Sequence, residues 1–241
     1  GNFKNYIEAK FKLIKNQSRG DYAFIDSKNK ILKELIKKNR IKSKVKIVDY
    51  KKYLNYLKFI KNNYFKNLSN IKNLTFVLEV SKLLKINFKK VFQAINKFKG
   101  LNYRQQIIYD TKNLMVINDS KSTSLSSTKL LLESFENIYW IVGGLAKKGD
   151  KFNLKKKYFK KIRAYIYGKD YIFFSRILSK KMPTKVTKNL NDSLKLVFHD
   201  LNQNKKKKII LFSPSAASFD QFKNFEQRGF YFNKIIKKYL N

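Results

Sequence analysis

The sequence predicts an α/β protein of two units, the second of which is built around a doubly wound, Rossmann-like parallel sheet. Through the second half of the chain, apolar runs of strand length alternate with helical segments. Strands separated by helices imply parallel crossover connections. The character of the sequence also changes at Gly100, so we expect a boundary between the two units near residues 98–102.

The first unit is predicted to mix helices with two short strands. Apolar positions recur at helical spacing from residue 3 onward, whereas "DYAFID" alternates between apolar and polar residues as a half-buried strand does. The predicted helices cover residues 3–16, 28–39, 70–86 and 88–98, and the predicted strands cover residues 21–26 and 44–50.

The second unit is predicted to begin with two strands, "QQIIYD" and "LMVIND", which flank a turn at residues 111–113. Strands and helices then alternate to the end of the chain. The further strands are expected at residues 138–144, 164–168, 184–188 and 208–213, and the helices near residues 124–134, 153–161, 170–179, 190–202 and 225–239.

The charge of the chain is extreme, with 55 basic and 16 acidic residues and a formal net charge of +39. Such a field attracts nucleic acid and anionic surfaces. However, nearly all of the bases are lysines spread over the whole length, whereas specific nucleic-acid readers favour arginine for its fork of donors. Lys, Asn, Ile, Phe and Tyr also share A/T-rich codons. We therefore interpret the charge as compositional background, and a basic nucleic-acid-binding protein is the alternative from another functional class.

Other classes are excluded by what the sequence lacks. There is no cysteine, hence no disulfide framework or thiolate chemistry. No apolar run approaches the roughly 20 residues that a membrane-spanning helix needs. We expect a cytoplasmic protein without a specific nucleic-acid or membrane partner.

Four polar clusters in the second unit follow the ends of predicted strands. They are "NDSKST" (118–123), "GGLAKKGD" (143–150), "GKD" (168–170) and "SPSAASFDQFKNFEQRG" (213–229). Parallel topology places all four at the same edge of the sheet, where α/β proteins bind ligands. For any one cluster the alternative is a turn with helix-capping residues, and Ser122, Thr123 or Ser124 could cap the helix that follows. The residues alone leave both interpretations open.

Three of these segments carry a resemblance to a known family. "GLNYRQQII…INDSKSTS", "ESFENIYWIVGGLAKKGDKF" and "SPSAASFDQFKNFEQRGFYF" together resemble the C-terminal domain of the Mur ligase family, in its branch that adds D-glutamate to UDP-N-acetylmuramoyl-L-alanine. The resemblance implies that residues 1–98 are the C-terminal part of the central ATP-binding (ATPase) domain. Residues 99–241 are then a complete Rossmann-like C-terminal domain that binds the amino acid.

The resemblance implies an ATP- and Mg²⁺-dependent enzyme, acting as a monomer in peptidoglycan precursor synthesis. It phosphorylates the carboxylate of UDP-N-acetylmuramoyl-L-alanine, and the amine of D-glutamate then attacks the acyl phosphate. The implied nucleotide-binding residues are Asn70, Asn73, Arg104 and Asp119. The implied D-glutamate-binding groups are Lys121, Thr123, Lys147, Ser218 and the backbone N–H of Phe225. Lys10 corresponds to a lysine that becomes carbamylated in the family and would then face magnesium, a cation that prefers oxygen ligands.

The chain also departs from the family. It contains no G-x-x-x-x-G-K-[ST] phosphate loop, and it begins with Gly1 in place of methionine, which suggests an internal fragment. The family's uridine-binding domain and metal-binding histidine would lie upstream, so we expect this chain to be inactive alone. His199, the only histidine, is expected to be a surface residue. Leu145 stands where the family commonly has a polar residue. Another amide-forming Mur-type ligase is the alternative within the enzyme class, although "SPSAASFDQF" favours D-glutamate.

If the lysines are compositional background, DNA binding should be weak, insensitive to sequence and lost steeply as salt rises, because it rests on phosphate contacts alone. Fluorescence-anisotropy titrations of two unrelated duplexes between 50 and about 200 mM salt would measure this. Sequence-selective binding that persists at the higher salt would support the nucleic-acid alternative instead.

Overall fold

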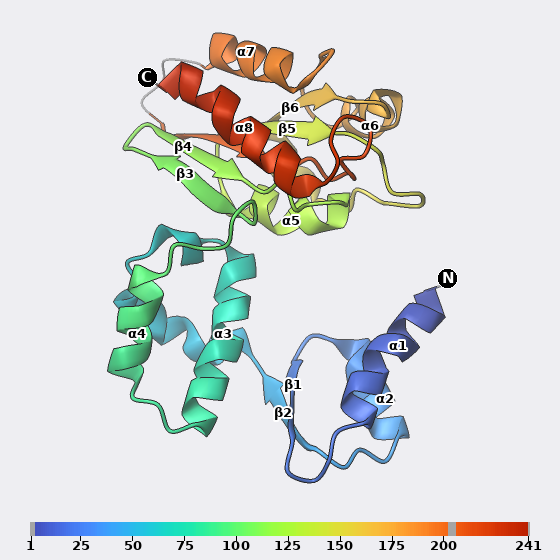
Figure 1. The fold of residues 1–241 in the computed structure, drawn as a ribbon, viewed down its shortest axis with the longest axis vertical. Coiled ribbons are helices and arrows are strands. Elements are labelled where there is room, and N and C mark those ends of the chain that lie inside the picture. The colour runs from blue at the N-terminus through green and yellow to red at the C-terminus, as the bar shows by residue number, and fades with distance from the viewer. Residues whose placement is uncertain (1–2, 202–205, 241) are drawn as a thin grey trace. The chain divides into compact units, whose positions relative to one another are not determined.

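The computed structural model describes residues 3–201 and 206–240 (Figure 1). The chain divides into two compact units. The first unit comprises residues 3–62 together with 70–97, and the second comprises residues 63–69 together with the described residues from 98 onward.

The first unit opens with a small crossover motif. Helix α1 (Phe3–Lys15) precedes strand β1 (Tyr22–Asp26), and helix α2 (Lys30–Lys38) connects β1 to strand β2 (Lys44–Val48), which pairs with β1 in parallel. The buried residues of this motif are Phe11, Ile14, Ala23 and Ile25, against which the apolar face of α2 packs. All four elements were predicted from apolar spacing, within two residues at each end.

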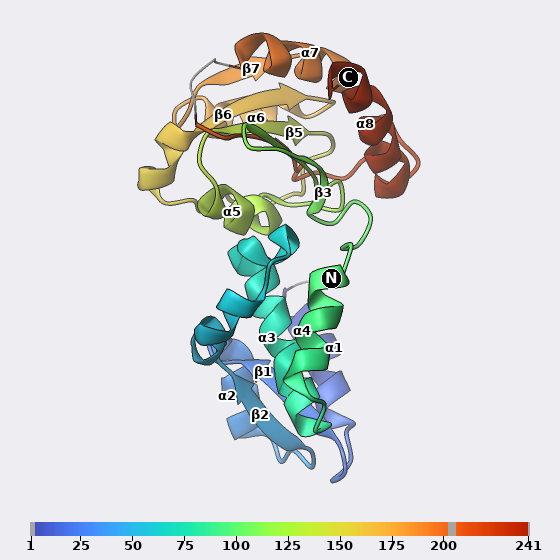
Figure 2. The ribbon, with the colours of Figure 1, turned by 90° about the vertical axis from the view of Figure 1, so that its left-hand side faces the viewer.

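The remainder of the first unit is helical. A 3₁₀ helix, η1 (Tyr50–Phe59), precedes α3 (Leu68–Leu83) and α4 (Phe88–Lys97), which lie alongside each other (Figure 2). Aromatic rings join η1 to α4: Tyr56 lies edge-on to Phe88, with ring centroids 5.4 Å apart, and Phe59 stacks on Phe92 at 5.5 Å. The sequence pattern did not predict η1, nor the short 3₁₀ helix η2 (Asn63–Lys66), which belongs to the second unit.

The second unit contains a six-stranded sheet with the strand order β3-β4-β8-β5-β6-β7. Only β3 is antiparallel to its neighbour, and the other five strands run in parallel. The strands are β3 (Gln106–Asp110), β4 (Leu114–Asn118), β5 (Ile138–Gly143), β6 (Ile162–Tyr167), β7 (Thr184–Val186) and β8 (Lys208–Phe212). The carboxyl ends of β4, β5, β6 and β8 therefore share one edge, as the sequence predicted for the four polar clusters that follow them.

Helices cover both faces of this sheet (Figures 1 and 2). One core, centred on the fully buried Trp140, packs under α5 (Leu125–Ser134) and α6 (Tyr171–Leu178). The other, which includes Phe212 and Phe232, packs under α7 (Leu190–Asp200) and α8 (Phe225–Leu240). Both faces of the central strands are buried, which explains why β5 reads as a continuous apolar run. Within residues 3–201 and 206–240, no helix combines the length and apolarity that crossing a membrane requires.

The helix predicted at residues 153–161 is shorter than expected and of the 3₁₀ type, η3 (Lys156–Lys161). Its sequence is KKYFKK. An α-helix would align Lys156 with Lys160 and Lys157 with Lys161 at i, i+4, and like charges at that spacing destabilise a helix. A 3₁₀ helix aligns side chains at i, i+3 instead, which leaves one such lysine pair, Lys157 and Lys160, in place of two.

The carboxyl end of β5 should be sensitive to any side chain at Gly143. Its φ is +139°, and a Cβ there would lie 1.8 Å from the carbonyl oxygen of Tyr167. Gly143→Ala should lower the free energy of unfolding of the second unit by at least about 3 kcal/mol, because backbone strain and steric overlap add. Gly149→Ala is the matched control: its φ is +76°, but no atom lies within 4 Å of the added Cβ, so only the left-handed strain of about 1–2 kcal/mol applies. Urea unfolding followed by Trp140 fluorescence measures both, and equal losses would contradict this account.

Candidate functional site

Two loops meet at the carboxyl edge of the sheet. Leu145 and Ala217 form an antiparallel bridge, in which Leu145 N–H donates to the Ala217 carbonyl at 3.0 Å and Ala217 N–H donates to the Leu145 carbonyl at 2.9 Å. The bridge places the segment that carries Lys147 beside the segment that carries Ser218. Lys147 is exposed, whereas Ser218 is buried with 3% of its surface exposed.

A second contact joins the end of β4 to the start of α8. The Lys121 ammonium lies 3.8 Å from the centroid of the Phe225 ring, a distance that gives a favourable cation–π interaction. The hydroxyl of Ser120 donates to the Phe225 carbonyl at 2.9 Å. Phe225 is the first residue of α8, where backbone N–H groups lack partners within the helix and favour an anion.

The loop of residues 143–150 is also fastened to α5. The Asp150 carboxylate accepts a hydrogen bond from Leu125 N–H at the start of that helix. The predicted D-glutamate-binding groups thus come from segments that touch one another within the second unit. Two ammonium groups, a hydroxyl and a helix N-terminus at one sheet edge form an arrangement that can pair with a dicarboxylate.

The hydroxyl-rich segment after β4 does cap a helix, through Ser124. Its hydroxyl accepts from Ser127 N–H, and Ser127 completes a capping box. Ser122 instead belongs to a buried chain of hydroxyl contacts: it lies 2.7 Å from Thr128, which in turn lies 2.7 Å from Ser213. Thr123, the third candidate cap, is exposed.

Asp119 ends this chain of hydroxyl groups and faces the interior of the second unit. One carboxylate oxygen accepts from Ser213 Oγ at 2.9 Å, and the other accepts from Gln105 N–H at 3.1 Å. Burial raises the pKa of Asp119 to about 7, against the opposing effects of these bonds and of Arg104. Only 6% of the Asp119 surface is exposed. The role of Asp119 in holding ribose hydroxyls stays a prediction.

The other predicted nucleotide residues lie in different settings. Asn70 and Asn73 lie one turn apart on α3, where Asn70 is buried and Asn73 exposed. Arg104 is exposed in the turn before β3. Lys10 is exposed on α1, and its ammonium lies 5.8 Å from the Tyr6 ring. Among the described residues, no group of three His, Cys, Asp or Glu side chains could hold a metal ion.

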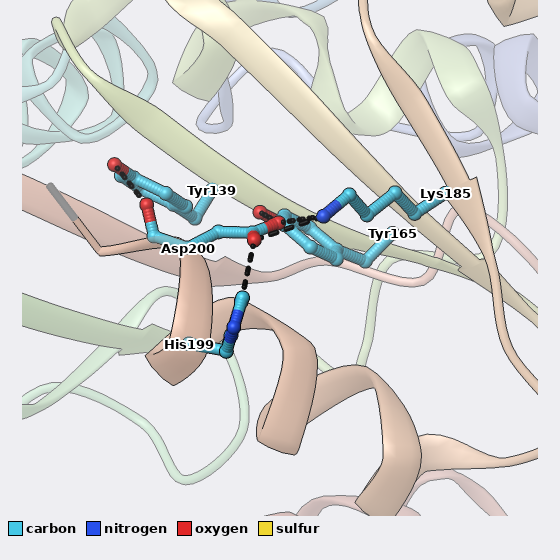
Figure 3. Close-up of polar contacts among 5 residues, drawn as sticks. All are labelled: Tyr139, Tyr165, Lys185, His199 and Asp200. Carbon is cyan, nitrogen blue, oxygen red and sulfur yellow. Dashed lines mark hydrogen bonds and ion pairs between the residues drawn. The ribbon is translucent and has the colours of Figure 1, made fainter.

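His199 lies on the surface, as predicted, with 80% of its side chain exposed. Its Nδ1 contacts Asp200 at the end of α7 (Figure 3). Asp200 also accepts hydrogen bonds from Tyr165 and Lys185, of β6 and β7, at 2.9 and 2.8 Å. These interactions attach the end of α7 to β6 and β7, so the role of the cluster is structural.

Two residues of the edge, Ser120 and Arg228, were not among the predicted site residues. Arg228 donates to the Ser120 and Ala216 carbonyls, and so connects two of the segments described above. One signal in the sequence could have identified it. Arg228 occupies the same helical stripe as the apolar Phe232, Ile235 and Ile236, where an arginine must be buried.

Comparison with known proteins bears on the family of this chain. No protein-family model matches it. The UDP-N-acetylmuramoylalanine–D-glutamate ligase of Rickettsia prowazekii is 31% identical over an alignment of 254 positions, gaps included, which covers 98% of this chain and 57% of that relative. The ligase of the same name from the Wolbachia of Brugia malayi is 36% identical over 170 residues, 70% of this chain and 34% of the relative. The chain belongs to the Mur ligase family.

The predicted resemblance is thereby confirmed, and in sequence this chain is a MurD-like Mur ligase. It spans about half the length of the Rickettsia relative. Among solved structures, the UDP-N-acetylmuramate-alanine ligase MurC of Thermotoga maritima matches 72% of this chain and 38% of its own, with a TM-score of 0.50 and 16% identity. That likeness concerns the α/β fold alone.

The buried carboxyl of Asp119 should leave a signature in the pH dependence of stability. Its folded pKa of about 7 lies above the ordinary value of 3.8, so the folded state binds the proton more tightly. The free energy of unfolding should therefore fall as pH rises from about 4 to about 7, and this contribution should be constant above pH 7. Asp119→Asn removes this titrating group. Between pH 4 and pH 7 the free energy of unfolding of the variant should therefore rise by on the order of 2–4 kcal/mol relative to that of the parent protein.

Asp200→Asn is the control of opposite sign. Burial tends to raise the pKa of Asp200, but hydrogen bonds from Lys185, His199 and Tyr165 lower it overall. That carboxylate therefore stabilises the fold above its ordinary pKa, and its contribution is lost as pH falls. Asp200→Asn should lose stability relative to the parent protein as pH rises. Urea unfolding at half-unit pH steps distinguishes the two, and parallel curves for both variants would refute the assignment of Asp119.

Proposed function

We propose that the protein containing this chain joins D-glutamate to UDP-N-acetylmuramoyl-L-alanine, and that the second unit binds the D-glutamate. One observation carries the proposal: the segments that hold Lys121, Lys147, Ser218 and the first N–H of α8 touch one another at a single sheet edge. The names of the relatives support the choice of amino acid.

The two carboxylates of D-glutamate explain why this edge needs several donors. Removing an anion from water is costly unless hydrogen bonds and opposite charge replace its hydration. Lys121 and Lys147 supply ammonium groups, Thr123 and Ser218 supply hydroxyl groups, and Phe225 supplies a backbone N–H. These groups come from a helix terminus and from loops that backbone hydrogen bonds hold together, so they can orient the amine of D-glutamate as well as bind its carboxylates.

The activating chemistry in the proposed reaction comes from ATP, which phosphorylates the acceptor carboxylate. Asn70, Asn73, Arg104 and Asp119 are proposed to bind this nucleotide. The exposed Lys10 is accessible to carbon dioxide, and a carbamate there would give magnesium an oxygen ligand. This chain's own contribution to the step is to bind the nucleophile in the correct orientation, so that the amine faces the activated carbonyl carbon.

Lys147→Ala in the full-length protein should weaken D-glutamate binding about tenfold to hundredfold, because it removes a charge-assisted hydrogen bond worth about 1.5–3 kcal/mol. Ser218→Ala should cost less, about 0.5–1.5 kcal/mol, since a neutral donor is lost. D-glutamate saturation curves at fixed ATP and acceptor measure both effects.

Lys148→Ala is the matched control, because it removes a neighbouring exposed lysine from the same loop. Its saturation curve should coincide with that of the parent protein. Curves for Lys147→Ala and Ser218→Ala that do not move would contradict the proposed site. Turnover with another amino acid but not with D-glutamate would favour a different Mur-type ligase.

A further inference from the structure

Arg228 is a buried guanidinium without an ion pair among the described residues. It lies on the inner face of α8 with 1% of its surface exposed, next to Gly229 and one turn before Phe232. Burial lowers the pKa of Arg228, with partial compensation from nearby Tyr167 and Asp220. Burying a cation without a paired carboxylate costs desolvation free energy, so it does not by itself stabilise a fold. The hydrogen bonds of Arg228 indicate a role other than stabilisation.

Those bonds converge on the segments of the candidate site. Arg228 Nε donates to Ser120 Oγ at 3.1 Å, and Nη2 donates to the Ser120 carbonyl at 2.8 Å and to the Ala216 carbonyl at 2.9 Å. Ser120 in turn links Arg228 to the start of α8, because its hydroxyl donates to the Phe225 carbonyl. Ser120 directly precedes Lys121, and Ala216 lies two residues before Ser218. One guanidinium thus connects the backbones on both sides of the site.

The loop that carries Lys147 packs against the same group. A Cβ added to Gly144 would lie 3.3 Å from Arg228 Nη1 and 2.6 Å from the Ala217 carbonyl, so only glycine allows this approach. Nη1 and the buried Tyr167 hydroxyl lack a hydrogen bond of regular geometry to any described residue, although the two groups interact with each other. A buried polar atom without a regular hydrogen bond costs stability, so stability alone does not explain an arginine at this position.

We propose that Arg228 is the positioning residue of the amino-acid site: it fixes the four segments that carry Lys121, Lys147, Ser218 and the Phe225 amide. This inference rests on the proposed function for the identity of the ligand, D-glutamate. The Nε and Nη2 groups of Arg228 donate to Ser120 and Ala216, so the effect of this guanidinium on the ligand passes through those two residues. Its loss should move donors away from the carboxylates, whereas Asn70 and Asn73, which lie in the first unit, should keep their positions.

The test compares Ser120→Ala and Arg228→Lys in the full-length protein. Arg228→Lys keeps the charge, but its single, shorter-reaching nitrogen cannot reproduce the three hydrogen bonds, and it should raise the KM for D-glutamate about tenfold or more. The KM for ATP should rise less than the KM for D-glutamate, because Asn70 and Asn73 lie in the first unit. Ser120→Ala removes a single hydroxyl, and should raise the KM for D-glutamate about threefold to tenfold. If Arg228→Lys fails to fold, Ser120→Ala decides the question alone.

Ser193→Ala is the matched control. Ser193 is equally buried, and its hydroxyl contacts Thr187 and the Asn189 carbonyl at the start of α7, outside the four segments. It should lose comparable stability without changing the KM for D-glutamate. A merely structural role for Ser120 and Arg228 would lower the active fraction, hence kcat, in all three variants and leave every KM alike. That result would overturn the proposal.

Amide hydrogen exchange separates this inference from the proposed function. In the absence of any substrate, Ser120→Ala should accelerate exchange about tenfold in residues 120–124, 144–147 and 216–218, and Ser193→Ala should not. If the parent protein does not use D-glutamate but Ser120→Ala still accelerates exchange in these three segments alone, the positioning role is supported and the proposed substrate is wrong. Exchange that rises uniformly over the second unit would overturn the positioning role, whatever the substrate.

Discussion

The close crossing of backbones at the end of β5 is the constraint on which the candidate site depends. Gly143 and Gly144 both have positive φ angles, and Gly143 N–H donates to the Pro214 carbonyl at 2.9 Å. Side chains at these positions would collide with the Tyr167 and Ala217 carbonyls. The loops after β5, β6 and β8 meet this closely because Gly143, Gly144 and also Gly168, whose Cβ would lie 2.7 Å from Gly144 N, have no side chain. The positions of Lys147 and Ser218 relative to each other follow from that crossing and from the Leu145–Ala217 bridge beyond it.

Net charge does not distinguish the site, because lysines occur over the whole chain. What distinguishes Lys121 is how it is held: its backbone N–H donates to the Tyr103 carbonyl, and its ammonium lies over the Phe225 ring. A flexible surface lysine loses rotamer freedom when it binds an anion, which offsets part of the attraction. A lysine already ordered by its neighbours has less to lose, so preorganisation matters more than the number of cations.

The sequence predicted the order of elements and the shared edge of the polar clusters, because strand period and crossover topology are encoded locally. It did not predict η1, whose ten residues form a 3₁₀ helix stabilised by ring contacts with α4. It also did not identify Ser120 or Arg228. Each has an ordinary explanation in isolation, as a turn serine and a helix arginine, and their bond joins residues 108 positions apart. The burial of Asp119 is likewise a tertiary property, since it requires Ser213 and Gln105 to lie on either side of the carboxylate.

The two interpretations of the segment after β4, helix capping and ligand binding, are compatible because its residues alternate in exposure. Ser120 and Ser122 are buried and bind backbone or hydroxyl partners, and Ser124 caps α5. Lys121 and Thr123, between them, are partly or fully exposed. The chain turns at Ser120 and Lys121, where Ser122 N–H donates to the Asp119 carbonyl at 2.9 Å. This turn directs Ser120 and Ser122 inward while Lys121 and Thr123 face outward, so the segment can contact the interior with one set of residues and present the other set to a ligand. The hydrogen bonds of the buried Ser120 and Ser122 then fix the positions of Lys121 and Thr123. For that reason the hydroxyl of Ser120 can influence a ligand that it does not contact.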